Sequence, residues 1–218
     1  SHSGEHMVVP RLVYISNTPE VGTVYRRAEL AALRRLCDEL ALLLYCDGAR
    51  LGSAMAAGDA SFADYGALCD AFTVGGTKNG LLFGEALVIV NPALQSGFRR
   101  CMKQQGAILA KGRLLGVQFS AILQDGLYLS LAAQANRLAR RLAEGLEDLG
   151  VPLLFPAQSN QLFPVLPDSV VEALEGEVSF ELQERVEGSR SCIRLVTAWD
   201  TAQEEVDGLL ALLGRLLQ

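Results

Sequence analysis

The sequence predicts an α/β fold in which a mostly parallel sheet is followed by a small α+β unit. Short apolar runs alternate with helical segments through the first half of the chain. After Gly106 two strongly helical segments follow, and the last third again holds short apolar runs. Strands that alternate with helices imply crossover connections between parallel strands, which is typical of layered α/β proteins.

Four strands are expected in the first half. Leu12–Ile15 is a short apolar run that a turn-rich Ser-Asn-Thr-Pro segment closes. From Ala28, leucines recur at helical spacing as far as Leu40. The run Ala41–Cys46 consists only of hydrophobic residues, as expected for a strand that is covered on both faces. The other elements expected here are a short helix at 64–68, strands at 72–74 and 86–90, and a helix that opens at Pro92.

Helices dominate the next part of the chain. Lys111–Leu123 and Leu127–Leu149 are strongly helical, and Gly150 is placed to end the second segment. A final helix is expected to open at Thr201, with Glu204 completing a capping box. Between them lie short apolar runs at 151–155, 162–166 and 193–197.

Composition limits the possible functions. The chain has 218 residues, of which 50% are hydrophobic and 20% charged, and a net charge of −6 argues against a general nucleic-acid binder. No apolar run reaches the ~18 residues that span a bilayer, and we expect no secretory signal. The five cysteines include no CxxC pair, so neither a zinc site nor a disulfide framework is indicated, and a cytoplasmic protein is expected.

Two sequence segments combine to suggest a site. Asp47 follows an apolar strand directly, and ligands of open α/β sheets gather at the carboxyl ends of strands. Lys78 lies in Gly-Gly-Thr-Lys-Asn-Gly after the strand at 72–74, where a partly desolvated lysine can act as an amine nucleophile. A phosphate-binding P-loop is excluded, because its first glycine and its Ser/Thr after the lysine are replaced by Phe72 and Asn79.

Each of these residues also has a simpler interpretation. Asp47 could cap a helix and pair with Arg50, and Lys78 could be a solvated side chain in a glycine-rich turn. Together, however, they are 78 − 47 = 31 positions apart, each at the end of its own strand. A pyridoxal enzyme needs a lysine at the aldehyde carbon and an acid at the pyridine nitrogen of one ring. Ends of neighbouring strands can present both.

Further basic residues could bind anions. Arg194 stands in an otherwise apolar run, where a charge needs a partner, and its guanidinium could bind a carboxylate through two hydrogen bonds. A structural salt bridge is the alternative. A basic stretch could hold an anion or a subunit contact, although a solvated helix face explains it better; it comprises Arg99, Arg100, Lys103, Lys111 and Arg113. His2 and His6 receive no role.

Five stretches, in order, make the chain similar to the threonine aldolase and β-eliminating amino-acid lyase family, which has the aspartate-aminotransferase type of fold. They spread over nearly the whole chain and are residues 12–17, 20–25, 47–52, 75–80 and 194–197. From the resemblance we expect residues 1–125 to form the C-terminal half of a large cofactor-binding domain. Residues 126–218 are then expected to form a long connecting helix and a small C-terminal domain.

The resemblance also implies roles for individual residues. Lys78 matches the lysine that binds pyridoxal 5′-phosphate covalently, and Asp47 matches the aspartate that faces the pyridine nitrogen. Thr77 matches a cofactor-binding position. Arg50 matches an arginine near the cofactor and the substrate carboxylate, and Arg194 matches the small-domain arginine that binds that carboxylate. The implied reaction cleaves a β-hydroxy amino acid to glycine and an aldehyde, in a homodimer or homotetramer.

The chain also departs from the family pattern. Family members are considerably longer at the N-terminus, and the part without a counterpart here carries the cup for the cofactor phosphate. We therefore expect little or no turnover from these 218 residues alone. A β-eliminating lyase or an aminotransferase of the same fold is the enzymatic alternative. The non-enzymatic alternative is a remnant whose unpaired sheet edge drives association.

Overall fold

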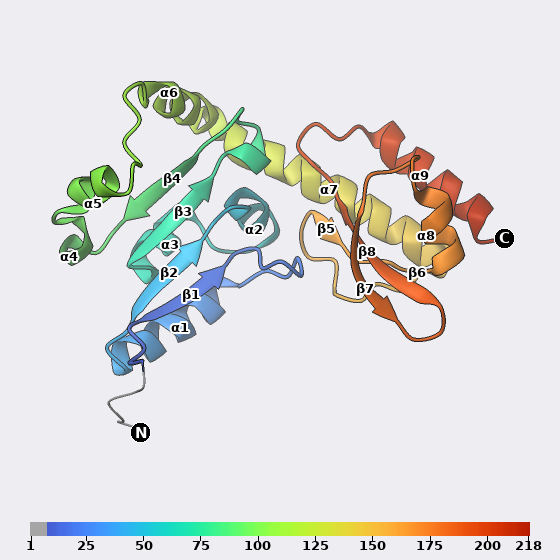
Figure 1. Ribbon diagram of the computed structural model, residues 1–218, viewed down its shortest axis with the longest axis horizontal. Coiled ribbons are helices and arrows are strands. Elements are labelled where there is room, and N and C mark those ends of the chain that lie inside the picture. Colours follow the sequence, from blue (N-terminus) through green and yellow to red (C-terminus); the bar gives the residue numbers. More distant parts are fainter. Residues whose placement is uncertain (1–7) are drawn as a thin grey trace.

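The computed structural model describes residues 8–218, and it contains two sheets. The long helix α7 (Leu127–Asp148) runs from one sheet to the other, as Figure 1 shows. His2 and His6 lie outside the described residues.

The first sheet has the order β1-β2-β3-β4. β1, β2 and β3 are parallel, and β4 runs antiparallel to β3, so the expected mostly parallel sheet is confirmed. The four strands are β1 (Leu12–Ser16), β2 (Leu43–Asp47), β3 (Ala71–Gly75) and β4 (Glu85–Ile89).

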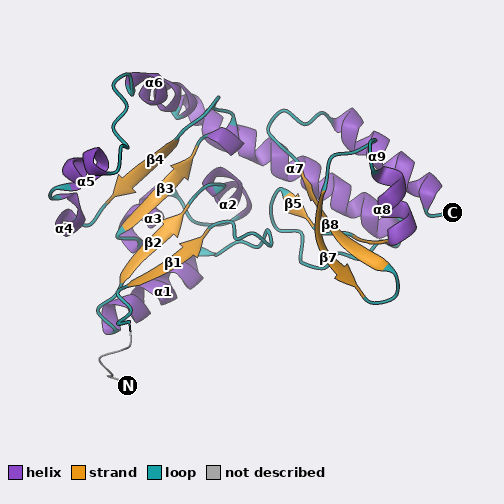
Figure 2. Ribbon diagram, in the orientation of Figure 1, coloured by secondary structure: helices purple, strands orange, loops and turns teal. Residues whose placement is uncertain are grey.

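Helices α1 and α3 pack against one face of this sheet (Figure 2). Leu30 and Cys37 of α1 and Tyr65 of α3 are buried against Leu44 and Cys46 of β2. The helices of this part are α1 (Arg27–Glu39), α2 (Leu51–Ala57), α3 (Phe62–Leu68), α4 (Pro92–Gln95), α5 (Phe98–Gln104) and α6 (Arg113–Ile122).

The expectation that both faces of β2 are covered is wrong. Burial alternates along the strand, because Leu44 and Cys46 point into the core while Tyr45 and Asp47 are half-buried on the other face. On that face Tyr14 of β1 is 57% exposed and Leu87 of β4 is 42% exposed. We call it the open face of the sheet.

The strand β2 also begins later than expected. Ala41 has a positive φ of 52° in the turn that ends α1, where the Leu42 amide donates to the Cys37 carbonyl at 2.8 Å. Pairing with β1 starts at Leu43. Ala41 therefore belongs to the helix end, which hydrophobicity alone does not reveal.

The second sheet is antiparallel and short-stranded, which confirms the expected α+β unit. β8 (Arg190–Val196) is its centre and pairs with β5 (Gln161–Leu162), β6 (Val165–Pro167) and β7 (Glu181–Val186). Leu138 and Leu146 of α7 are buried against it together with side chains from α8 (Asp168–Leu174) and α9 (Gln203–Leu216).

The apolar run at 151–155 forms an isolated bridge, between Leu153 and Pro164. The expected start of the final helix is wrong by one residue. The N-cap of α9 is Ala202 and not the predicted Thr201: the Ala202 amide donates to Glu205 at 2.8 Å, and Glu204 does not close a capping box. Thr201 instead accepts a hydrogen bond from the Ala198 amide.

Length and apolarity decide whether a helix could cross a membrane. None of the described helices alone is long and apolar enough to do so, although α6 and the segment Gln124–Asp148, bent by 67° at their junction, together meet that criterion.

Candidate functional site

The parallel strands bring Asp47 and the turn that carries Lys78 to one edge of the first sheet. Asp47 is the last residue of β2, and Gly75 is the last residue of the neighbouring β3. The Gly75 amide donates to the Gly48 carbonyl at 2.9 Å, so the two chain segments touch just beyond the strands. The predicted juxtaposition of these two strand ends is therefore present.

Asp47 is held at both carboxylate oxygens. Its Oδ1 accepts a hydrogen bond from the Ala49 amide at 2.9 Å, and its Oδ2 accepts one from the Tyr14 hydroxyl at 2.5 Å. The half-buried side chain stays on the open face of the sheet. Asp47 does not cap α2, whose N-cap is Arg50, and no ion pair joins these two side chains among the described residues.

Lys78 lies in a single 3-10 turn, Thr77–Asn79, and the residues on either side of it form hydrogen bonds that hold the turn in place. The buried Asn79 side chain donates to the Tyr128 carbonyl at 2.7 Å. Gly80 closes the turn with a φ of 106°, a conformation that favours glycine. The Thr77 hydroxyl accepts a hydrogen bond from the Gly84 amide at 3.0 Å. The Lys78 side chain itself is exposed, so the expected partial desolvation is not seen in the described residues and the simpler interpretation, a solvated lysine in a glycine-rich turn, fits its burial.

Lys78 lines two depressions. One, of about 370 Å³, is formed with Thr77, Ala49 and the glycine backbone at 75, 76 and 84. The other is small and is lined by Arg50, Asn160 and Trp199 as well. The side-chain Oδ1 of Asn160 is buried without a hydrogen-bond partner among the described residues. Thr77, Lys78 and Arg50 thus lie together, whereas Asp47 adjoins the first depression through Ala49.

Arg194 reaches toward the first sheet from the second. Its Nη1 is 3.1 Å from Glu20 and its Nη2 is 2.7 Å from Glu181, while its buried Nε has no partner among the described residues. Burial lowers the pKa of Arg50; the charge of Glu20 opposes this shift, and the charge of Arg194 adds to it. The charges of Arg194 and Glu20 thus both act on Arg50. Arg194 itself forms the structural salt bridge that was the alternative interpretation.

The basic stretch does not form a unit. Arg99, Arg100 and Lys103 belong to α5, while Lys111 and Arg113 lie at the start of α6. None of them lines the depressions around Lys78. Among the described residues, no group of three or more metal-ligating side chains is placed to hold a metal ion.

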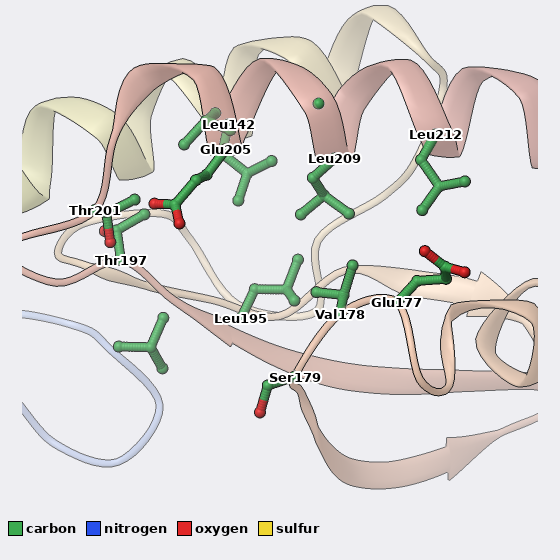
Figure 3. A pocket seen from close by; sticks show the side chains of 13 residues that line it. Leu142, Glu177, Val178, Ser179, Leu195, Thr197, Thr201, Glu205, Leu209 and Leu212 are labelled. Atoms are coloured by element: carbon green, nitrogen blue, oxygen red, sulfur yellow. The ribbon is translucent and has the colours of Figure 1, made fainter.

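A separate hollow of about 490 Å³ lies in the second unit, between β8 and α9 (Figure 3). Leucine side chains form much of its wall, and the carboxylates of Glu177 and Glu205 lie at it. It contains no lysine, arginine or histidine. Because none of the predicted site residues lines it, we place the candidate chemistry at the strand ends and not here.

Tyr14 and Glu20 were missed as site residues by sequence reasoning. Tyr14 lies opposite Tyr45 in register, and therefore on the same face as Asp47. Period-two alternation in both strands could have indicated this. Glu20 lies in one of the stretches that carry the family resemblance, but its contact with Arg194, 174 positions away, has no local signal.

Comparison with known proteins identifies what the chain is similar to. The family model described as β-eliminating lyase matches residues 1–169. Low specificity L-threonine aldolase of Pseudomonas aeruginosa is 39% identical over 204 residues, which are 92% of this chain and 58% of that protein. The corresponding protein of Saccharomyces cerevisiae is 30% identical over 193 residues, covering 82% of this chain and 49% of that protein.

Comparison with solved structures points to the same family of proteins. A threonine aldolase structure from Leishmania major superposes with a TM-score of 0.96 at 43% identity, covering 99% of this chain and 64% of that chain. Aspartate aminotransferase from Thermotoga maritima superposes with a TM-score of 0.66 at 17% identity, covering 95% and 56%, which shows a shared fold. The present chain thus spans less than two thirds of the length of each of these relatives.

Proposed function

The chain belongs to the β-eliminating lyase family, and we propose that it serves a pyridoxal-phosphate-dependent lyase that cleaves a β-hydroxy amino acid to glycine and an aldehyde. The observation that supports this is the meeting of Asp47 and the Lys78 turn at one sheet edge. Because the chain spans 58% of the Pseudomonas aeruginosa relative, the reaction is proposed for the whole protein. A cytoplasmic homodimer or homotetramer without nucleic-acid or membrane partners is part of the proposal.

The side chains at this edge fit pyridoxal phosphate. Lys78 offers an exposed amine with no salt-bridge partner among the described residues. Asp47 offers a carboxylate whose orientation two donors fix. At Gly48 and Gly75 a Cβ atom would collide with the neighbouring backbone, so both glycines allow the strand ends to lie close together. The cofactor ring requires an amine for its aldehyde and an acid for its nitrogen. The carboxylate of the amino-acid substrate requires a cation, which the two arginines offer.

Each residue would then have a distinct task. When bound, pyridoxal phosphate supplies a ring that withdraws electrons from the carbon whose bond is cleaved. The Lys78 amine would bind the aldehyde carbon, and the Asp47 carboxylate would accept a hydrogen bond from the ring N–H. The Thr77 backbone and hydroxyl would contact the cofactor. Arg50 and Arg194 would orient the substrate carboxylate, which fixes the Cα–Cβ bond relative to the ring.

Covalent trapping tests the cofactor assignment. The chain has three lysines, Lys78, Lys103 and Lys111, so each can be followed by peptide mass spectrometry. Incubation with pyridoxal phosphate followed by borohydride should place the cofactor mass on the Lys78 peptide, and Lys78→Ala should remove it. Lys103→Ala is the control, because Lys103 lies on α5 away from the strand ends. Equal labelling of the three lysines would refute the assignment.

Product analysis of the whole protein, for which the reaction is proposed, tests the reaction itself. The lyase should yield glycine and an aldehyde from a β-hydroxy amino acid without any acceptor. An aminotransferase of the same fold would instead yield a keto acid and would require an acceptor. A β-eliminating lyase would release ammonia together with a keto acid. A non-catalytic remnant would yield none of these.

A further inference from the structure

The relation between Tyr14 and Asp47 carries a further inference, which rests on the proposed function. Tyr14 and Tyr45 are register partners on β1 and β2, and their ring centroids are 5.4 Å apart. Asp47 follows Tyr45 by two positions, so its side chain emerges on the same face. The Tyr14 ring therefore extends along the open face, and its hydroxyl reaches Asp47 Oδ2 at 2.5 Å.

The two donors to Asp47 come from different parts of the chain. The Ala49 amide is local, since it lies two residues after the carboxylate. Tyr14 belongs to the neighbouring strand and is 57% exposed, so its position is not required to fill the core. A carboxylate that must hold one orientation benefits from such a second anchor.

We propose that Tyr14 is a positioning residue for the ring-binding acid: by donating to Oδ2, it holds the Asp47 carboxylate on the open face in the orientation that receives a pyridine N–H. Each carboxylate oxygen accepts more than one hydrogen bond, so Oδ2 can keep Tyr14 and still accept from the ring. The hydrogen bond to Asp47 raises the pKa of Tyr14, which keeps the hydroxyl a donor throughout the neutral range.

A pair of ligands separates positioning from a structural role. Pyridoxal 5′-phosphate and its benzaldehyde analogue, in which C–H replaces the ring nitrogen, both offer an aldehyde to Lys78, but only the first meets Asp47 through a ring nitrogen. Tyr14→Phe should weaken pyridoxal phosphate binding about tenfold, as expected for one hydrogen bond to a charged group, and leave the analogue unchanged. Tyr45→Phe is the matched control, since Tyr45 lies beside Tyr14 without contacting the Asp47 carboxylate.

A second measurement needs no ligand. The pKa of Tyr14 can be measured by NMR in a chain labelled with ¹³C at the tyrosine ζ carbon, where the resonance that Tyr14→Phe removes is that of Tyr14. In the Asp47→Asn variant the pKa of Tyr14 should fall toward the ordinary tyrosine value, because the hydrogen bond to Asp47 is the main cause of its rise. An unmoved titration would show that the hydrogen bond is not formed in solution and would overturn the inference.

The remaining outcomes are distinguishable. If Tyr14→Phe binds both ligands as the unaltered chain does, while Lys78 is still labelled and Asp47→Asn weakens pyridoxal phosphate binding, only the inference on Tyr14 fails. Tighter binding of pyridoxal phosphate by Tyr14→Phe would show that the hydroxyl competes with the ring, which also overturns it. If neither the unaltered chain nor the whole protein forms a Lys78 adduct, the proposed function fails and takes the inference with it.

Discussion

The Tyr128 hydroxyl donates a hydrogen bond to the Gly75 carbonyl at 3.0 Å, which ties the long helix α7 to the strand end beside Lys78. The same hydroxyl accepts from the Gly52 amide at 3.1 Å, and the Tyr128 carbonyl accepts from Asn79 at 2.7 Å. Tyr128 is almost fully buried, and burial raises the pKa of its hydroxyl group. One residue of α7 therefore fixes both sides of the turn that carries the proposed nucleophile.

Replacing Tyr128 with Phe should destabilise the protein and loosen this turn. The change leaves the Gly75 carbonyl and the Gly52 amide without this partner, which costs about 1–3 kcal/mol for a buried polar group. We expect that loss in the free energy of unfolding measured with urea. Ser130→Ala removes an exposed hydroxyl from the same helix and should change stability by less than about 0.5 kcal/mol. Equal stabilities of the two variants would contradict the role given to Tyr128.

Replacing Gly75 with Ala tests the close contact of the strand ends. A Cβ atom at this position would collide with the backbone of Ala49, so the end of β3 that leads to Lys78 would have to move away from the segment that follows Asp47. We expect a loss of about 1–3 kcal/mol, as for overpacking, and loss of the borohydride-trapped adduct on Lys78.

The matched control for that variant is Gly66→Ala. Gly66 lies inside α3, and no atom lies within 4 Å of the place that an alanine Cβ would take, so alanine should stabilise the protein by about 0.5–1 kcal/mol and leave the adduct intact. A stable Gly75→Ala variant with normal labelling of Lys78 would show that the strand ends tolerate separation.

The parts of the fold that have a local signal were predictable, and the parts set by distant contacts were not. The strands at Leu12 and Phe72 and the helix from Leu127 follow from hydrophobic pattern and turn residues. The helix α2 was missed, because Gly52, Ser53 and Ala54 are small residues that α7 buries, and burial by a distant helix leaves no periodic leucine pattern. The strand β7 was missed because five of its six residues are exposed.

The same distinction applies to the site. Asp47 and Lys78 could be paired from sequence because each follows a strand, and parallel strands end at one edge. The contact of Arg194 with Glu20 depends on how two sheets are placed relative to each other, and the hydrogen bond from Tyr14 depends on register. Neither is encoded in a short stretch of residues.

The stability of the protein should fall between about pH 4 and pH 2, in part because of Asp64. Hydrogen bonds from the Ser61 side chain and backbone, together with Arg27, lower the pKa of Asp64 to about 2. An unfolded aspartate has a pKa of about 3.9. Because the folded pKa is the lower one, the stabilisation is present above about pH 4 and is lost as the pH falls through the folded pKa.

Melting temperatures of the unaltered chain and of Asp64→Asn, followed from pH 7 to pH 2, check this. The variant should melt at a lower temperature at pH 7 and should lose less of its stability on acidification. Asp200→Asn replaces an exposed carboxylate in the loop before α9 and should follow the unaltered chain over the whole range. Parallel curves for Asp64→Asn and the unaltered chain would contradict the assignment.

Arg194 and Glu20 should have opposite effects on the binding of an amino acid to the cofactor-loaded chain. Arg194→Lys removes the planar fork that grips a carboxylate, so the dissociation constant for glycine should rise about tenfold or more. Glu20→Gln removes a carboxylate that now lies 3.1 Å from the guanidinium, and it should tighten glycine binding, because the amino acid no longer has to displace a like charge. Both constants can be measured from the change in the visible absorbance of the bound cofactor. Arg190→Lys, at the exposed start of the same strand, should leave the constant unchanged. If Glu20→Gln weakens binding as Arg194→Lys does, Glu20 holds the arginine in place for the substrate and does not compete with it.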